Sequence, residues 1–221
     1  MKVAEALNAR STVRAFRSDP VAKETIEHII KAAIRTPSWA NSQPWEIYVA
    51  GNESLERIRK KWQERVKSDT PRKPEIPVPT HWPAVMQKRR EELTSNFRPA
   101  AVAREDEKSA MKIVSDLNNR FFGAPVVLYL CMDRTLTQWS MFDLGAMSQS
   151  IMLAAQEYGV DSAVAIMLAA YPDLIRTELG IPDDLAIVIG VALGYRDAQN
   201  PVNKFRSPRR PLEDVVHLKG L

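Results

Sequence analysis

Cysteine is almost absent from this sequence, and glycine is also scarce. The single cysteine, Cys131, excludes an internal disulfide, and its place in the apolar run 126–132 indicates a buried structural thiol rather than a nucleophile. The eight glycines form neither a Gly-x-Gly-x-x-Gly nor a Gly-x-x-x-x-Gly-Lys pattern. The sequence therefore contains neither the dinucleotide-binding fingerprint nor a P-loop.

Metal-ligand patterns and long apolar runs are missing too. The three histidines are scattered, without the spacing of a metal site and without a nearby serine or cysteine nucleophile motif. We therefore expect no metal and no catalytic side chain of the nucleophile or acid–base type. No run approaches the roughly 18 apolar residues of a membrane helix, and the first residues lack a signal-peptide pattern. These features predict a cytoplasmic protein without a membrane partner.

Composition indicates one globular domain over residues 1–221. Apolar residues make up 45% of the chain and charged residues 26%, which is ordinary for a folded domain with a sizeable core. The 31 basic and 27 acidic residues leave a net charge of +4. Basic residues in 57–67 are interleaved with Glu56 and Glu64, as on a solvated helix face. Arg206, Arg209 and Arg210 instead lie among prolines, which favours an anion site.

Four apolar segments interleaved with helices define the predicted fold class. Strands are expected at 45–50, 126–132 and 185–195, with an extended apolar segment within 159–167, and helices at 2–9, 53–68, 137–158 and 172–180. Ser18, Asp19 and Pro20 predict the start of a further helix that ends near Thr36. Most strands are apolar on both sides, so we expect an α+β fold with a central mixed β-sheet covered by helices.

Residues 69–122 are predicted to form an insertion that acts as a lid or substrate arm. Residues 70–83 contain five prolines, which prevent regular structure, and two helices are expected near 84–97 and 100–119. The aromatic residues of the insertion could stack on a substrate or anchor the insertion to the core. They are Trp82, Phe97, Phe121 and Phe122.

A stiff polar hinge at 36–45 is the most distinctive stretch of the chain. Prolines at 37 and 44 restrict its backbone, and between them lie Ser38, Asn41 and Gln43, with a tryptophan at 39 and another at 45. These donors and acceptors suit a planar, hydrogen-bonding ligand, although the same residues are common in an ordinary turn. A second polar stretch, with Arg10 and Arg14, offers guanidinium groups that bind phosphate or carbonyl oxygens.

Together these two stretches, 10–16 (RSTVRAF) and 37–45 (PSWANSQPW), resemble the N-terminal signatures of the nitroreductase family of FMN-dependent oxidoreductases. The tail 203–212 is similar to the family's C-terminal phosphate signature, with Arg209 the best match and Arg206 a weaker one. The resemblance implies that the backbone at 164–166 passes flavin N5. Asp143 is interpreted first as a helix-start residue and second as a flavin contact. The implied FMN-binding residues are Arg10, Ser11, Thr12, Arg14, Pro37, Ser38, Trp39, Asn41, Gln43, Asp143, Val164, Ala165, Ile166, Arg206 and Arg209.

The resemblance also implies an activity. NADH or NADPH would reduce bound FMN and leave, and a nitroaromatic or similar electron-poor small molecule would then accept the electrons in its place. Reduction of quinones or free flavins, or reductive dehalogenation, are alternatives on the same fold. The family resemblance and the apolar helix at 137–158 further imply a homodimer with FMN at the subunit boundary. A different class remains open, a basic nucleic-acid-binding module that uses 57–73 and the tail arginines.

Overall fold

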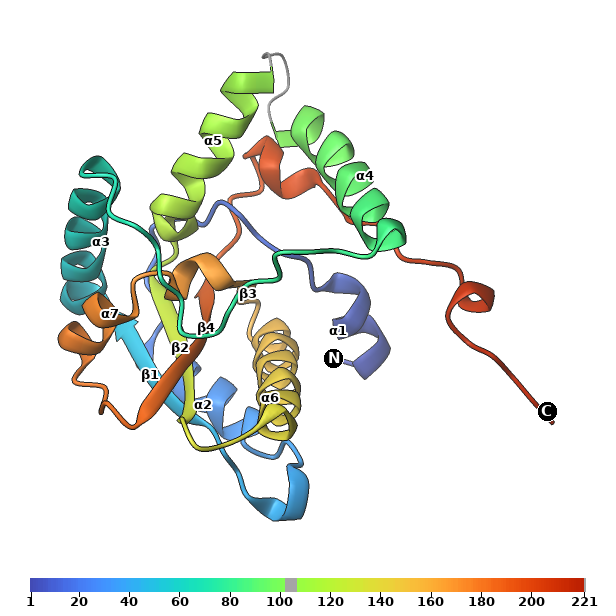
Figure 1. Ribbon diagram of the computed structural model, residues 1–221, viewed down its shortest axis with the longest axis horizontal. Coiled ribbons are helices and arrows are strands. Elements are labelled where there is room, and N and C mark those ends of the chain that lie inside the picture. Colours follow the sequence, from blue (N-terminus) through green and yellow to red (C-terminus); the bar gives the residue numbers. More distant parts are fainter. Residues whose placement is uncertain (102–106, 221) are drawn as a thin grey trace.

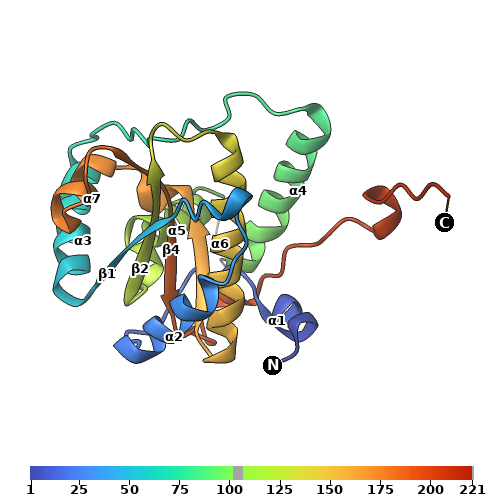
Figure 2. The ribbon, with the colours of Figure 1, turned by 90° about the horizontal axis from the view of Figure 1, so that it is seen from below.

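A four-stranded sheet lies at the centre of the fold, with helices against both of its faces (Figures 1 and 2). The computed structural model describes residues 1–101 and 107–220. The strands are β1 (Glu46–Gly51), β2 (Val126–Asp133), β3 (Asp161–Ala165) and β4 (Leu185–Gly194), in the spatial order β1-β2-β4-β3. The α+β architecture predicted from the sequence is confirmed.

Strand β2 shows why the sheet is covered on both sides. Its residues Val127, Tyr129 and Cys131 pack with helices α3 (Asn52–Lys67) and α7 (Pro172–Leu179). Its alternate residues pack with α2 (Lys23–Ala33) and α6 (Gln138–Glu157) on the other face. Because successive side chains of a strand point to opposite faces, an uninterrupted apolar run is buried between two helical layers. Burial raises the pKa of the Cys131 thiol to about 12, as expected for a structural thiol.

The sheet differs from the predicted mixed sheet in strand direction. All three pairs, β1 with β2, β2 with β4 and β3 with β4, are antiparallel. Among the described residues the parallel pairing is limited to an isolated bridge between Thr12 and Ser162. Apolar runs report that both faces are covered, but they carry no information about the direction of the neighbouring strand.

The remaining helices are α1 (Val3–Ala9), α4 (Ala84–Ala101) and α5 (Glu107–Asn119), and the last two lie together above the end of the sheet (Figure 1). The predicted start of α2 at 18–20 was wrong, since the helix begins at Lys23 with Ala22 as its N-cap. Asp19 instead pairs with Arg17 at 3.0 Å, so this carboxylate binds a neighbouring side chain rather than the helix terminus. Within the described residues no helix has both the length and the apolar character needed to span a bilayer.

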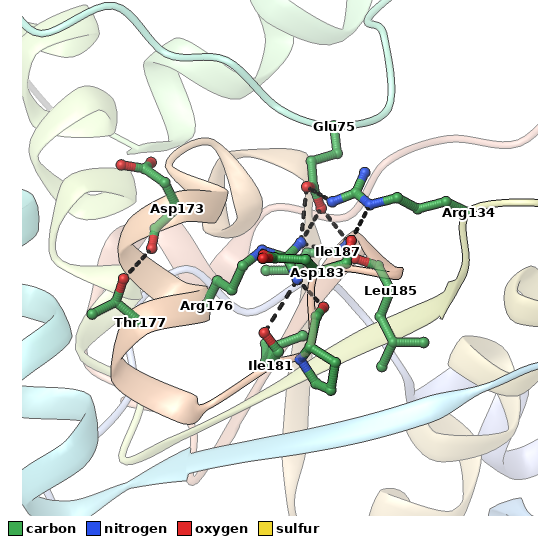
Figure 3. A network of polar contacts seen from close by, with 10 residues as sticks. Glu75, Arg134, Asp173, Arg176, Thr177, Ile181, Asp183, Leu185 and Ile187 are labelled. Carbon is green, nitrogen blue, oxygen red and sulfur yellow. Dashed lines mark hydrogen bonds and ion pairs between the residues drawn. The ribbon is translucent and has the colours of Figure 1, made fainter.

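The proline-rich segment before α4 is fastened to the core by Glu75 (Figure 3). Its carboxylate accepts hydrogen bonds from Arg134, from Arg176 at 2.9 Å and from the backbone N–H of Ile187 in β4. Nearby, the Lys73 N–H donates to the carbonyl of Ala170 at 3.0 Å. Polar contacts therefore hold a segment whose prolines cannot join the sheet.

Candidate functional site

Four arginines gather at one cavity of about 510 Å³. They come from two distant parts of the chain: Arg10 and Arg14 follow α1, while Arg206 and Arg209 belong to the tail. Ser11 and Thr12 line the same cavity. Among the described residues, no ion pair joins any of these arginines to a carboxylate. The cavity thus concentrates positive charge and hydrogen-bond donors, which favours an anionic ligand.

The N-terminal part of this cavity is held by the edge of the sheet. Thr12 bridges Ser162 of β3, and the Val13 N–H donates to the Ser162 carbonyl at 3.0 Å. Ser11 accepts a hydrogen bond from Arg196 at 3.0 Å. The segment therefore extends the sheet beyond β3, which fixes the backbone from which Arg10 and Arg14 project.

Asn203 joins the tail to this segment. Its side-chain oxygen accepts from the backbone N–H groups of Arg14 at 2.8 Å and Ala15 at 3.2 Å. Its amide nitrogen donates to the carbonyls of Ala15 at 2.6 Å and Asp197 at 2.9 Å. Asn203 is buried, so these four bonds satisfy its amide group and fix the position of the tail arginines relative to Arg14.

The side chain of Arg14 is half-buried against aromatic rings. Its guanidinium carbon lies 4.6 Å from the centroid of Phe97 in α4, and Phe97 meets Phe205 edge to face at 5.2 Å. Burial lowers the pKa of the Arg14 guanidinium, because desolvation disfavours its charged form. A partly desolvated cation of this kind interacts strongly with an anion or a carbonyl oxygen.

The tail arginines are more exposed than Arg14. The Arg206 side chain donates to the carbonyl of Asn203 at 2.9 Å, and Arg209 donates to the Ser207 hydroxyl at 2.8 Å. Burial lowers the pKa of Arg206, and the neighbouring charge of Arg196 adds to this effect. Both arginines thus turn toward the tail's own oxygen atoms while their remaining donors stay free for a ligand.

A second cavity, of about 460 Å³, adjoins the first. Arg14, Leu93 and Phe205 line both cavities and form the wall between them. Met167 lines the second cavity directly after the segment 164–166, which begins in β3 and continues into a short helix. The structure therefore brings the predicted flavin-facing backbone close to Arg14.

The hinge 37–43 lies at the other end of α6. The Trp39 N–H donates to Asp143 at 3.2 Å near the start of α6, whereas the amino terminus of Met1 pairs with Glu157 at its end. Asp143 and Glu157 are 14 positions apart, which corresponds to about 21 Å of helix. Within one chain, the hinge segment and Asp143 lie near the start of α6, whereas the N-terminal segment that leads through α1 into the arginine cavity pairs with the end of α6 (Figure 1). The predicted cofactor residues Pro37, Ser38, Trp39, Asn41, Gln43 and Asp143 all belong to the first of these two groups.

Asp143 is not a helix-start residue as first interpreted. The helix begins at Gln138, and Asp143 lies buried in its second turn. Its carboxylate instead supports the hinge through the Trp39 N–H, while the Ser38 hydroxyl accepts from the Gln43 N–H at 2.9 Å. Three hinge residues, Ala40, Asn41 and Gln43, have positive φ angles, so this loop holds a left-handed conformation that is uncommon outside glycine.

The four aromatic candidates of the insertion have different environments. Phe121 and Phe122 are buried in the core, where Phe121 packs edge to face on Trp62 at 4.8 Å. The expectation that these two rings stack on a substrate was wrong, and the alternative that they anchor the insertion is correct. Trp82 lies under Arg90 at 4.6 Å, and Phe97 is the only one of the four that lines a described cavity.

Sequence reasoning missed Asn203, Phe205 and Arg72 as site residues. Asn203 and Phe205 flank the predicted arginines of the tail, but nothing local distinguishes them from turn residues. Arg72 lines the second cavity and donates to the Asn119 side chain at 2.8 Å. The position of Arg72 between Pro71 and Pro74 could have indicated a binding residue, because prolines restrict the backbone that carries its side chain.

The residues at the arginine cavity fit the phosphate and sugar-like chain of FMN. Several guanidinium groups can bind phosphate oxygens, and the Thr12 hydroxyl can donate to a polyol or to phosphate. The chemistry of this donor set, without a carboxylate among the described lining residues, is what a phosphorylated cofactor requires.

Comparisons with known proteins identify the family of this chain. The sequence pattern of the nitroreductase family matches residues 7–195. The chain is 31% identical to a 4-nitrobenzoate reductase of Pseudomonas putida, over 96% of this chain and 93% of that protein. It is also similar to the crystal structure of an FMN and NADPH-dependent nitroreductase NfnB from Sphigopyxis sp. strain HMH, with 30% identity, a TM-score of 0.93 and full coverage of both chains.

A further similar structure is the FMN-dependent nitroreductase NfnB from Mycobacterium smegmatis in complex with NADPH. It shares 28% identity with this chain at a TM-score of 0.91, and the match covers 98% of each. Motifs, fold and comparisons thus point the same way, and the chain belongs to the nitroreductase family.

Proposed function

We propose that this protein is an FMN-dependent oxidoreductase that uses NADPH or NADH to reduce a nitroaromatic or similar electron-poor small molecule. The observation that carries the proposal is the cavity formed by Arg10, Arg14, Arg206 and Arg209 beside the edge of β3. The cofactors of the two NfnB structures and the substrate of the Pseudomonas relative support it.

Bound FMN would supply the two-electron chemistry, so the protein's own residues bind, orient and tune rather than transfer protons. Arg10, Arg206 and Arg209, with Ser11 and Thr12, would hold the phosphate and the ribityl chain. Arg14 would bind the pyrimidine edge, where its positive charge would stabilise added negative charge. The backbone of 164–166 would lie along the ring, and contacts made by backbone groups do not depend on the identity of the side chains.

The purified protein tests this proposal directly. It should be yellow, release FMN on denaturation, and lose its visible absorbance under anaerobic addition of NADPH or NADH. Addition of nitrobenzene should restore the absorbance, and benzoquinone in a parallel assay measures the quinone-reductase alternative. A colourless protein that takes up no FMN would contradict the proposal.

We further propose that two copies complete the site. The hinge residues contact α6 near its start, whereas Met1 of the segment that leads into the arginine cavity pairs with Glu157, about 21 Å along the helix. A second subunit would bring the hinge residues to the arginine cavity of its partner. Large aromatic residues are exposed around the start of α6: Trp39 (71%), Trp139 (69%) and Phe142 (74%). The tail beyond Arg209 runs away from the body of the chain and exposes Leu212 and Leu218 (Figures 1 and 2).

A group of exposed large aromatic side chains is typical of a protein–protein interface. Analytical ultracentrifugation at low protein concentration should therefore show a flavin-loaded dimer. Replacing Phe142 by aspartate should yield monomers with little bound FMN, since each monomer retains only part of the site. A monomeric parent protein with full flavin content would overturn the dimer.

The nucleic-acid-binding alternative is disfavoured by the pairing of its proposed cations. Arg65 forms a bidentate contact with Asp173 at 2.7 and 2.6 Å, and Arg57 and Lys61 both pair with Glu178. Cations that already bind carboxylates of α7 are poorly placed to neutralise phosphates. Membership of an enzyme family points the same way.

A further inference from the structure

We propose that the second cavity binds the electron acceptor and selects aromatic acceptors that carry an anionic group, which Arg72 recognises. The proposal rests on the function proposed above and names the substrate class of the same site. The cavity, of about 460 Å³, is within the range of small-molecule sites and opens between the inserted helices α4 and α5 and the core.

The walls of the cavity suit an aromatic ring. Phe97 of α4, Val114 of α5 and Met167 supply apolar surface. Met167 directly follows the backbone segment 164–166, so a ring held here lies next to the place where the proposed cofactor reacts. Residues of the predicted lid therefore form one side of this cavity, while the core forms the other.

The charge of the cavity favours an anion. Two guanidinium groups, Arg14 and Arg72, line it, and no carboxylate lies among its described lining residues. Arg14 also lines the arginine cavity and stacks on Phe97, so its guanidinium group is occupied by the proposed cofactor and by the aromatic ring. Arg72 remains as the cation that can bind the acceptor.

Arg72 is presented by a fixed backbone. The adjacent Lys73 N–H donates to the Ala170 carbonyl at 3.0 Å, and Glu75 is bound to the start of β4. The guanidinium of Arg72 makes one hydrogen bond, to the Asn119 side chain at 2.8 Å, which uses only part of its five donors. No described carboxylate forms an ion pair with it.

The anion could belong to the acceptor or to the 2′-phosphate of NADPH. That phosphate is on the adenosine end of NADPH, far from the nicotinamide that gives up the hydride. Seating it beside Met167 would carry the nicotinamide away from the redox position. A carboxylate attached directly to a nitroaromatic ring places both groups within one small cavity, so we assign the site to the acceptor.

The first test compares 4-nitrobenzoate with nitrobenzene on the FMN-loaded enzyme. Arg72→Gln should lower kcat/KM for 4-nitrobenzoate by about tenfold relative to nitrobenzene, the lower range for a lost charged hydrogen bond because Arg72 is exposed. Arg72→Lys should retain part of the preference. Lys73→Gln removes the same charge one residue away, outside the cavity lining, and should leave the ratio unchanged. Ser115→Asp, which adds a negative charge to the lining, should also lower the ratio.

The proposal would be overturned if Arg72→Gln left the ratio of kcat/KM for 4-nitrobenzoate to that for nitrobenzene unchanged, whether both values fell equally or neither fell. A loss that appears with NADPH but not NADH, at a constant acceptor ratio, would assign Arg72 to the donor phosphate and overturn it too. Calorimetric titration with benzoate and benzamide gives a readout without turnover: Arg72→Gln should weaken benzoate binding alone. If the parent protein reduces no acceptor, the proposed function fails, and benzoate binding still decides whether this cavity selects anions.

Discussion

The guanidinium of Arg14 lies 4.6 Å from the centroid of the Phe97 ring, so an arginine of the N-terminal segment rests on a helix of the insertion. Phe97 in turn meets Phe205 of the tail at 5.2 Å. Three parts of the chain that are distant in sequence therefore determine the position of one cation. The insertion therefore contributes to the proposed cofactor site as well as to the proposed acceptor cavity.

Replacing Phe97 by leucine should weaken FMN binding. Leucine keeps apolar bulk but removes the ring face, and a cation–π contact contributes about 0.5–2 kcal/mol, so the FMN dissociation constant should rise about 2- to 30-fold. Quenching of flavin fluorescence measures this constant. Arg90→Gln is a matched control, since it removes a contact of the same length between Arg90 and Trp82. Equal effects in the two variants would show that Phe97 acts only through helix stability.

Removal of the Asn203 side chain should lower both stability and cofactor affinity. In Asn203→Ala the N–H groups of Arg14 and Ala15 lose their acceptor. Because buried unsatisfied donors cost about 1–3 kcal/mol each, the free energy of unfolding should fall by about 2–4 kcal/mol. Urea denaturation at pH 7 measures it. Asn200→Ala removes one bond, to the Val202 N–H at 3.2 Å, and should cost about 1 kcal/mol or less without changing FMN affinity.

Arg14 and Arg209 should differ in their effect on the flavin's midpoint potential. Two-electron reduction adds negative charge at the pyrimidine edge, where Arg14 is proposed to lie. A hydrogen bond to a charged group contributes about 1.5–3 kcal/mol, and about 1.4 kcal/mol corresponds to 30 mV for two electrons. Arg14→Gln should therefore lower the midpoint potential by roughly 30–65 mV. Arg209→Ala should weaken FMN binding with little change in potential.

Spectroelectrochemical titration of both variants at saturating FMN makes this comparison. A potential for Arg14→Gln equal to that of the parent, or a larger shift for Arg209→Ala, would remove Arg14 from the pyrimidine edge. In that case its charge would serve the phosphate instead.

Glu75 should give the protein a stability that disappears in acid. Burial alone would raise the pKa of Glu75, but hydrogen bonds from Arg134 and the Ile187 N–H, with the charge of Arg176, lower it below its usual value. A depressed carboxyl pKa stabilises the fold at pH values above the unfolded pKa of about 4.3, and this contribution is lost as the pH falls through the folded value.

Glu75→Gln should accordingly lower the free energy of unfolding by about 1.5–3 kcal/mol at pH 7, and by much less at pH 3.5. Urea denaturation at the two pH values measures the difference. Glu53→Gln is the control, because Glu53 is exposed and its contact with Arg57 is 4.0 Å long. Its stability should change by less than about 0.5 kcal/mol. The same loss at both pH values would show that the Glu75 carboxylate contributes packing rather than charge.

Several elements could be read from local patterns. The apolar run that becomes β2 and the helical spacing that becomes α6 predicted those elements to within one or two residues. Local chemistry also marked the arginines at 10, 14, 206 and 209, which the fold gathers at one cavity. The start of α2 was misplaced because Asp19 had a competing partner in Arg17, and such competition is not visible in a pattern.

The sequence by itself determined which strands have apolar side chains on both faces, where prolines end helices and which side chains can bind an anion. Those properties depend on neighbours a few positions apart, so periodicity and residue chemistry report them. Tertiary structure alone decided that the strands run antiparallel, that Phe121 lies in the core while Phe97 lies under Arg14, and that the hinge is at the far end of α6. Contacts between residues far apart in the chain depend on how whole helices and strands pack, because each local pattern is compatible with several partners.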